Sequence, residues 1–448
     1  MSLRLEVIHD AVALERLSVP WRALLDRAAA PSLCKTPTWL LAWWRQFGGV
    51  EGRKLCMVAL YDTDTRELVA LIPLCRRTVM VRRVLPIRRL ELLATGEDQT
   101  DEICSDYTGA IVAAGYEEEV AETTARLLVG GRLGGFDHLV MPRMSAGDPF
   151  AGALAAALGR AGLHTTLEPE GACPYVPLPA SFDAYCQSLD RDRRYVVTRS
   201  LRELEKWAGP GGHARVVART PAQLAEGRAI LHSLHGERWS ANGHDGAFAN
   251  DRFTRFHDEV MTALLGADGH GGADGQLELQ WLVVGGRPVV VLYNIVCRGR
   301  VYFYQSGRKL DVPKGVKLGV AAHAIAMRAA IDEGHTEYDF LAGNSQYKRQ
   351  LALAKHALVT LTAAAPSVRA RTAVAAAAAL NQGLRRARIE LTGQRDRLAA
   401  VAPEHRSRAS ALALTALNRI LPPPIQQGQQ GQQGQQGANH AARDGQGT

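Results

Sequence analysis

A turn rich in lysine and glycine joins a strand pattern to a helix pattern, and its residue types suit the binding of phosphate. The turn reads Asp311-Val-Pro-Lys-Gly-Val-Lys-Leu-Gly319. A helix that begins in such a turn offers free backbone N–H groups and the positive end of its dipole, and a phosphate binds well there. The residues that we expect to bind a phosphate-bearing cofactor or co-substrate are Lys314, Gly315, Lys317 and Gly319.

A second group of polar residues follows this helix. Tyr338-Asp-Phe-Leu341 reads as a short strand, and Gly343 then opens the polar segment Asn344-Ser-Gln-Tyr-Lys-Arg349. The segment brings a carboxylate, a phenol and an ammonium group close together in the chain: Asp339, Tyr347 and Lys348. Groups of these types can accept a proton, donate a proton or hold an anion.

The surrounding pattern predicts the elements that position these residues. β-Branched and aromatic runs at Val289 to Val296 and Val301 to Gln305 are separated by Cys297-Arg-Gly-Arg300, as a hairpin requires. From Val316 to Glu333, apolar residues recur every three or four positions, which indicates a helix that ends at Gly334.

The first half of the chain repeats the same plan. It runs from helices to a predicted hairpin at 54–75, then to a helix at 116–129 and a strand that begins with Phe136-Asp-His-Leu139. This order suggests a degenerate internal duplication, so the expected fold is α/β (α+β) with two similar lobes. Three prolines, Pro174, Pro177 and Pro179, interrupt the pattern where the lobes would join.

Composition predicts four segments. We expect an N-terminal lobe at 1–172, a C-terminal lobe at 173–365, an Ala/Arg-rich helical extension at 366–421 and a disordered Gln/Gly-rich tail at 422–448. The residues after 365 hold eleven arginines against four acidic residues, and so carry most of the net charge of +8. The lobes are nearly neutral, which argues against specific DNA binding. The arginine-rich extension is a candidate for contact with a protein partner or an anionic membrane surface.

The cysteines and histidines argue against several classes of site. The seven cysteines are odd in number and contain no C-x-x-C pair, so we expect no disulfide framework and no metal site. No leader pattern opens the chain, and no uncharged apolar run has the length of a membrane span. The expected location is therefore the cytoplasm. A Ser/His/Asp hydrolase is disfavoured because no G-x-S-x-G motif follows a strand.

At these motifs the chain resembles a known family. Tyr302-Phe-Tyr-Gln-Ser-Gly307, the Lys/Gly turn, the long helix, Tyr338-Asp-Phe-Leu-Ala-Gly343 and Tyr347-Lys-Arg-Gln350 occur in an order similar to that of GNAT-superfamily acyltransferases. The resemblance is to the CelD-type, BioF2-like and FemAB-like group, and extends from Phe182 to Thr362. It implies two GNAT-like lobes, and an acetyl-CoA or other acyl-CoA bound through phosphate at the Lys/Gly turn.

The resemblance also implies roles for individual side chains. Asp339 would lie beside the point where two strands diverge, where it could act as the base, orient the acceptor or only hydrogen-bond a loop. Tyr347 would protonate the leaving thiolate. We expect the acceptor, a small molecule or glycan precursor with an amine or hydroxyl group, to contact Trp239, Tyr304, Ser306, Asn344 and Lys348. Packing is an equally simple role for the aromatic members of this set.

Two other functions remain open from the sequence. One is a FemAB-like transfer from an aminoacyl-tRNA, which the basic helix from Arg191 to Lys206 would suit. The other is a non-catalytic scaffold in exopolysaccharide or cellulose assembly, with the arginine-rich extension as its docking element. Asn344-Ser345 keeps this alternative open, because the family usually carries an acidic pair there. Acyl transfer in polysaccharide or cell-envelope biosynthesis is the function that the motifs favour.

Overall fold

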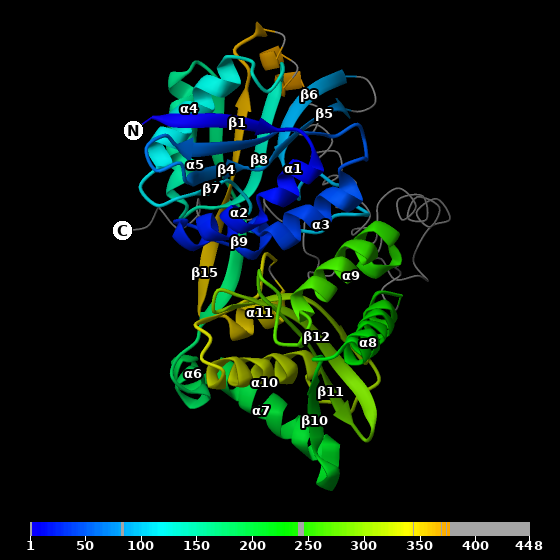
Figure 1. The fold of residues 1–448 in the computed structure, drawn as a ribbon. Helices are drawn as coiled ribbons and strands as arrows, with labels where there is room; N and C mark the ends of the chain where they lie inside the picture. Colours follow the sequence, from blue (N-terminus) through cyan, green and yellow to red (C-terminus); the bar gives the residue numbers. More distant parts are fainter. Residues whose placement is uncertain are drawn as a thin grey trace, which may run out of the picture.

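Two lobes share one long β-sheet in the computed structural model of the protein, as Figure 1 shows. The structure describes residues 2–81, 85–240, 246–343, 345–368, 370–372 and 374–376. Most of the predicted helical extension, and all of the predicted Gln/Gly-rich tail, lie outside these residues. The mixed α/β class predicted from the sequence is confirmed.

The N-terminal lobe, at the top of Figure 1, contains helices on both sides of short strands. Its elements are β1 (Leu3–Ile8), α1 (Ala11–Arg16), α2 (Ser18–Arg27), η1 (Leu33–Lys35), α3 (Pro37–Phe47), β2 (Lys54–Leu55), β3 (Met57–Asp62), β4 (Leu68–Ile72), β5 (Leu74–Val81), β6 (Leu85–Leu92), β7 (Ile111–Val112), α4 (Glu117–Val129), β8 (His138–Ser145) and α5 (Pro149–Arg160). Four of these strands form a separate sheet in the order β1-β3-β4-β7.

The C-terminal lobe, at the bottom of Figure 1, carries the residues of the predicted site. Its elements are α6 (Phe182–Ser188), α7 (Arg191–Ala208), η2 (Gly209–Gly211), β10 (His213–Val217), α8 (Pro221–Ser240), η3 (Ala247–Ala249), α9 (Asp251–Leu265), β11 (Gln276–Val284), β12 (Arg287–Cys297), β13 (Arg300–Arg308), α10 (Leu318–Asp332), β14 (Glu337–Asp339) and α11 (Gln346–Leu351). The predicted hairpin, long helix and short final strand are β12 with β13, α10 and β14.

Two long strands, β9 (His164–Pro177) and β15 (Ala354–Ala364), connect the lobes. The large sheet has the order β10-β11-β12-β13-β14-β9-β15-β8-β6-β5-β2. β15 is antiparallel to β9 from Ala354 to Ala364, and its later part also pairs with β8. The sheet therefore continues through the predicted boundary at 172 without interruption.

Each lobe contains one comparable parallel strand pair. In the N-terminal lobe, β6 and β8 pair in parallel through Arg89–Glu91 and His138–Val140. In the C-terminal lobe, β13 and β14 pair through Arg300–Tyr302 and Glu337–Asp339. The repeated plan read from the sequence is thus visible in the topology.

Local capping explains where two neighbouring helices are separated. α6 and α7 are separate helices, because Asp190 begins a new helix by accepting a 2.9 Å hydrogen bond from the Arg193 N–H. α1 and α2 meet at Leu17.

The glycine-rich segment at 266–275 is anchored at its end. Asp274 is buried and accepts hydrogen bonds from the Thr38 backbone N–H and hydroxyl at 2.8 and 2.6 Å, and from Arg22 at 2.8 Å. The loop therefore fixes the C-terminal lobe against the first turn of α3 in the N-terminal lobe.

Two apolar cores lie on opposite faces of β13. The larger core contains Trp39 and includes Tyr302 and Tyr304 from this strand. The smaller core contains Phe303, and α10 covers it. Among the described residues, no helix combines the length and the apolar character needed to cross a bilayer. All seven cysteines are free thiols.

Candidate active site at the divergence of two parallel strands

The parallel strands β13 and β14 diverge immediately after Asp339. They pair over Arg300–Tyr302 and Glu337–Asp339 only, after which β13 continues to Arg308. The other chain turns away, and Leu341 there adopts a φ of 56°, a left-handed conformation that is uncommon for a leucine. The family resemblance likewise implied that Asp339 lies beside a point where two strands diverge.

A β-bulge marks the same part of β13. Tyr293 of β12 pairs with Gln305, whereas the next residue, Asn294, pairs with Phe303. Tyr304 is therefore the extra residue of the bulge. Bulges redirect side chains and are common beside active sites, so the irregular register is consistent with a site at this end of β13.

The predicted phosphate turn leads into α10 as expected. Lys317 occupies the N-cap of α10 without a side-chain capping bond, and the first turn contains no acidic residue. The first N–H groups of an α-helix have no partner within the helix. Lys314, Gly315 and Lys317 are exposed and Gly319 is half-buried. The turn is therefore open to an anionic ligand.

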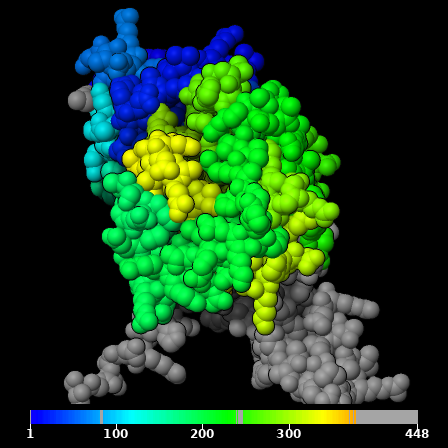
Figure 2. All heavy atoms as spheres, turned by 90° about the horizontal axis from the view of Figure 1, so that it is seen from below, coloured from blue at the N-terminus to red at the C-terminus, as the bar shows by residue number. Residues whose placement is uncertain are grey.

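Gly315 and Gly319 differ in what their positions demand. Gly315 has a φ of 105°, a conformation that L-residues with side chains rarely adopt. A Cβ at Gly319 would have no other atom within 4 Å. A Cβ at Gly315 would lie 4.0 Å from Arg199 Nη2, which places the exposed side of α7 beside the turn. Figure 2 views the molecule from below, where the green surface of the α6 to β10 region borders the yellow surface of later residues.

Asp339 is fully buried, and both of its carboxylate oxygens accept hydrogen bonds. The Tyr107 hydroxyl donates to Oδ2 at 2.6 Å, and the Leu341 N–H donates to Oδ1 at 2.7 Å. Burial raises the pKa of Asp339 to about 7, although the bond from Tyr107 acts in the opposite direction. The geometry therefore gives Asp339 a structural role, and its pKa also suits proton transfer near neutral pH.

Tyr347 lies in a cluster of aromatic rings beside the divergence. Its ring is stacked on His323 at 5.2 Å with 6° between the planes, and His323 also meets Phe303 at 4.5 Å and Phe340 at 5.3 Å. Burial lowers the pKa of His323 to about 3, so this imidazole is neutral at physiological pH. The early turns of α10 are thus packed against the residues on either side of the divergence.

Lys348 is buried and holds the turn that follows Asp339. Its Nζ donates hydrogen bonds to the carbonyl oxygens of Leu341 and Ala342 at 3.2 and 2.7 Å. Burial lowers the pKa of this lysine to about 8. Its present contacts stabilise the backbone, in a position close to the proposed chemistry.

The other predicted acceptor contacts fall into two groups. Tyr304 is buried, and its hydroxyl lies 2.5 Å from the Ile103 carbonyl oxygen and 2.9 Å from His257 Nε2. Ser306 and Trp239 instead lie around His235, whose Nδ1 is 3.1 Å from the Ser306 carbonyl oxygen and whose ring is 5.8 Å from that of Trp239. Asn344 lies outside the described residues.

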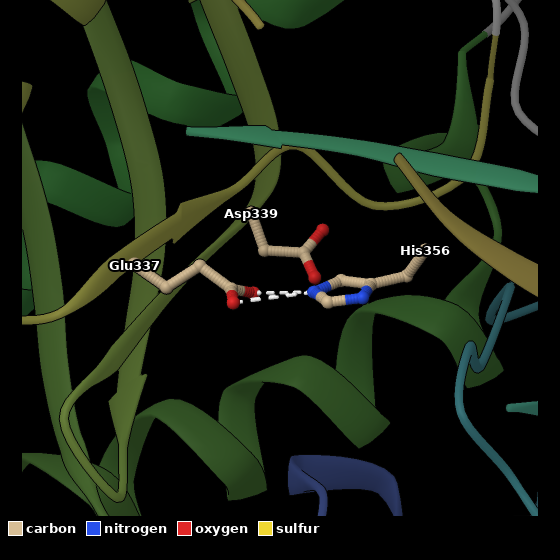
Figure 3. Close-up of side chains that lie close together, drawn as sticks. All are labelled: Glu337, Asp339 and His356. Carbon is tan, nitrogen blue, oxygen red and sulfur yellow. Dashed lines mark hydrogen bonds and ion pairs between the residues drawn. The ribbon is translucent and has the colours of Figure 1, made fainter. Parts of the chain in front are cut away.

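Asp339 belongs to a cluster of three polar side chains that was not expected from the sequence. Figure 3 shows Glu337, Asp339 and His356 with their polar atoms directed toward one another. His356 Nε2 lies 3.1 and 3.2 Å from the two Glu337 carboxylate oxygens. The imidazole is stacked on the Tyr175 ring at 3.9 Å and 3°. These contacts fix the imidazole against β14.

The same three residues have the donor types of a metal site, with ligand atoms that lie within 4.8 Å of one another. However, Arg300 Nε is 2.8 Å from a Glu337 oxygen, and Asp339 is already engaged by Tyr107. A metal ion would have to displace or accommodate the arginine cation. The arrangement therefore fits a hydrogen-bonded network better than a metal centre.

The N-terminal lobe contributes residues to this site that sequence reasoning missed. Tyr107 reaches Asp339, and Asp106 Oδ2 accepts a 2.7 Å hydrogen bond from the Ala342 N–H. Arg143 holds Asp106 from the other side at 2.8 Å. The segment around Asp106 has no helical or strand periodicity, and its partners in the C-terminal lobe are more than 200 residues away, so no local signal identifies it.

Comparison with known proteins agrees with this geometry. Residues 191–349 match the family described as "Acetyltransferase (GNAT) domain". No curated protein matches the chain. The FemX crystal structure resembles the fold with a TM-score of 0.51 at 10% identity, covering 80% of this chain and 96% of FemX.

Two further structures show lower similarity. L-PGS from Bacillus licheniformis has a TM-score of 0.42 at 12% identity, covering 80% of this chain and 95% of that one. A tandem GNAT protein from the clavulanic acid biosynthesis pathway has a TM-score of 0.41 at 15% identity, covering 82% of this chain and 100% of that one.

The domain matched at residues 191–349 defines a transferase that acts on acyl groups. Residues 191–349 form a domain of the GNAT acetyltransferase type, and this domain makes the protein a GNAT-type acyltransferase. The family resemblance expected from the sequence is thereby confirmed.

Proposed function

We propose that the protein transfers an acyl group, acetyl or longer, from acyl-CoA to an amine or hydroxyl group of a small-molecule or glycan-precursor acceptor. The observation that carries this proposal is the divergence of β13 from β14 beside a helix N-terminus that has no side-chain cap. The donor's pyrophosphate would bind the backbone N–H groups of the first turn of α10, and the exposed Lys314 and Lys317 would add positive charge.

Asp339 and Tyr347 are the proposed catalytic pair. Asp339 would take the proton of the attacking nucleophile, a role supported by a pKa near neutrality. Tyr347 would protonate the departing thiolate. Because Asp339 is fully buried against Tyr107, access to its carboxylate requires a shift of the Tyr107 side chain.

An aminoacyl-tRNA is the second candidate donor. The observation in its favour is the exposed basic side of α7, where Arg191, Arg199 and Arg202 are exposed and Arg199 lies next to Gly315. A polynucleotide could follow this side of α7 toward the same turn.

The free cysteines support a reducing location, and we propose that the reaction takes place in the cytoplasm, in polysaccharide or cell-envelope biosynthesis.

Equilibrium binding of the two donors tests the proposal. We expect coenzyme A and acetyl-CoA to bind the full chain. We expect an aminoacyl-tRNA to bind no more tightly than an RNA of equal length that carries no amino acid. Specific binding of the charged tRNA, with no binding of coenzyme A, would transfer the assignment to the second candidate. The acceptor class is then identified by measuring the free thiol that acetyl-CoA releases in the presence of each of a panel of amines and amino sugars. The thiol released by hydrolysis without an acceptor is subtracted.

A further inference from the structure

A pocket of about 240 Å³ lies between the lobes, and its lining includes Tyr107, whose hydroxyl contacts Asp339. The N-terminal lobe supplies the segment before α3 and the start of the β8 to α5 connection, and the C-terminal lobe supplies the β12 to β13 turn. The lining residues are Ala29, Ala30, Pro31, Ser32, Lys35, Tyr107, Ser145, Gly147, Cys297, Arg298, Arg300, Tyr302 and His356. Pockets for drug-sized ligands hold about 300–1,000 Å³, so this one suits a small molecule or one end of a larger molecule.

The charge of the lining has a single sign. Lys35, Arg298 and Arg300 contribute three permanent cations, and the lining contains no acidic residue. The carboxylates that pair with these cations, Asp148, Asp26 and Glu337, all stand outside the lining. Arg298 and Arg300 are each more than a quarter exposed, so their remaining N–H groups are available to a ligand. Two guanidinium groups in one pocket are well suited to a carboxylate or a phosphate.

His356 adds a hydrogen-bond acceptor to this cationic pocket. Its Nε2 is held by Glu337, and since a carboxylate accepts, Nε2 carries a hydrogen. In the tautomer with its hydrogen on Nε2, Nδ1 is an acceptor, and Nδ1 makes no hydrogen bond to a described residue. Because His356 lines the pocket, Nδ1 is the ring nitrogen that remains for a ligand N–H or O–H.

We propose that this inter-lobe pocket is the acceptor site, and that it takes a small amine or alcohol that also carries a carboxylate or phosphate. Arg298 and Arg300 hold the anionic group, and His356 Nδ1 accepts a hydrogen bond from the nucleophilic group. Tyr107 connects the pocket to the reaction centre, since this residue lines the pocket and its hydroxyl contacts Asp339. This inference rests on the proposed acyl transfer and specifies its acceptor class.

Calorimetric titration of the full chain with four probes tests the site. Phosphoethanolamine and ethanolamine form one pair, and glycine and glycinamide form the other, so that each pair differs by an anionic group. We expect the member with the anionic group to bind in at least one pair, and the matched member without that group to bind at least roughly tenfold more weakly, as is typical of charge-assisted hydrogen bonds. The pair in which the anionic group increases the affinity shows whether the pocket recognises a phosphate or a carboxylate. If no anionic probe binds at tens of millimolar, the proposal is wrong.

Variants assign the binding to named residues. Arg298→Asn suits the left-handed backbone of this position, where φ is 51°, and should weaken the anionic probe at least roughly tenfold. Arg298→Lys should restore part of the affinity. Arg160→Asn removes an exposed arginine that is paired with Glu122 outside the pocket, and should change nothing. Equal loss in Arg298→Asn and Arg160→Asn would overturn the assignment.

His356 is tested by the difference between two ligands. His356→Phe keeps a ring to stack on Tyr175 and removes both nitrogens. We expect this variant to bind phosphoethanolamine several-fold more weakly than the parent does, with an unchanged affinity for inorganic phosphate. If the pocket takes a carboxylate, glycine should bind more weakly and acetate should be unaffected. Parallel loss for both members of the pair would contradict the role given to Nδ1.

Coenzyme A binding separates this proposal from the proposed function. Arg298→Asn should retain the coenzyme A affinity of the parent, because the donor turn lies elsewhere. If the parent protein does not bind coenzyme A, the acyl-CoA assignment is wrong. The titrations with the four probes would still decide whether the pocket binds anions.

Discussion

Tyr107 and Asp339 are 232 residues apart in the chain and are joined across the two lobes by a 2.6 Å hydrogen bond. The phenol donates to the carboxylate, and both side chains are buried. The hydrogen bond connects the divergence of β13 and β14 to the inter-lobe pocket, because Tyr107 belongs to both places. The site is therefore formed by both lobes.

Asp339 should make stability decrease as the pH rises through the acid range. Its pKa is raised from 3.8 to about 7 in the folded protein, so between these values the folded state binds the proton and the unfolded state does not. The stability of the parent relative to Asp339→Asn should then fall from pH 4 to pH 7, by up to about 1.4 kcal/mol per pH unit. Denaturant unfolding of both proteins at each pH measures this difference. A difference that does not change with pH contradicts the raised pKa.

The same substitution separates catalysis from structure. If Asp339 is the base, Asp339→Asn should reduce turnover by roughly 10²-fold or more at an unchanged donor affinity. Activity is measured per folded molecule, with the folded fraction taken from the unfolding curve. Full specific activity in that fraction would leave Asp339 with a structural role only.

Lys348 should have the opposite pH signature at alkaline pH. Its pKa falls from 10.5 to about 8 on folding, so between these values the unfolded state binds the proton and the folded state does not. The parent should gain stability relative to Lys348→Met as the pH rises from 8 toward 10. A constant offset is also expected, because the variant leaves the Leu341 and Ala342 carbonyl oxygens without the Lys348 donor. Urea unfolding at four alkaline pH values checks the slope, and a flat difference would refute it.

The turn from Lys314 to Gly319 should no longer bind coenzyme A when a side chain blocks the approach of the ligand to its backbone. A side chain at Gly319 meets no atom within 4 Å, so Gly319→Val should fold normally and hinder the ligand alone. We expect coenzyme A binding to be abolished in this variant. Calorimetry measures the binding, and an unchanged melting temperature is the control. A folded Gly319→Val protein with the affinity of the parent would show that the donor binds elsewhere.

Lys314→Ala should have a smaller effect at the same turn. Lys314 is exposed, and the backbone carries most of the proposed grip, so the loss should be about 1 to 2 kcal/mol of binding free energy. The loss should shrink as salt is raised, because exposed charges are screened. Titrations at low and high ionic strength test this, and a salt-independent loss would argue against a direct charge contact.

Removal of the C-terminal extension should depend on where the chain is cut. The composition changes at Ala365, which predicts a dispensable tail, but Ala370 is fully buried and its N–H donates to the Ser367 hydroxyl at 3.1 Å. A chain that ends at residue 376 should therefore keep the melting temperature and donor affinity of the parent. A chain that ends at 365 should be less stable by about 1 kcal/mol, the scale of one buried methyl group. Equal stability of the two shortened chains would show that Ala370 adds nothing.

The sequence predicts the local elements of the C-terminal lobe well, because each has its own signal. The β12 to β13 turn falls at Arg298 and Gly299, both with positive φ, and α10 ends just before Gly334, whose φ is 79°. Alternating and helical patterns of apolar residues determine these elements. The predicted site residues Asp339 and Lys348 also lie close together, since only a short turn separates them.

What the sequence does not reveal depends on distant contacts. His356 lies on an ordinary strand pattern, and nothing in its neighbourhood shows that it meets Glu337 on another strand. The arginines between 76 and 89 form a run of positive charge in the sequence, yet the Arg77 side chain is 7% exposed and forms a 2.7 Å ion pair with the buried Glu91. Pairing of this kind follows from the β5 to β6 register, which cannot be deduced from a charge run.

The position of β15 has a consequence for how the protein is made. This strand lies between β8 and β9 of the N-terminal lobe, although its residues, Ala354–Ala364, come at the end of the described fold. During synthesis the earlier strands leave the ribosome long before their partner does. The edges of β8 and β9 that β15 covers therefore stay unpaired until β15 has been synthesised, and a newly made chain is exposed to edge-to-edge association during that interval.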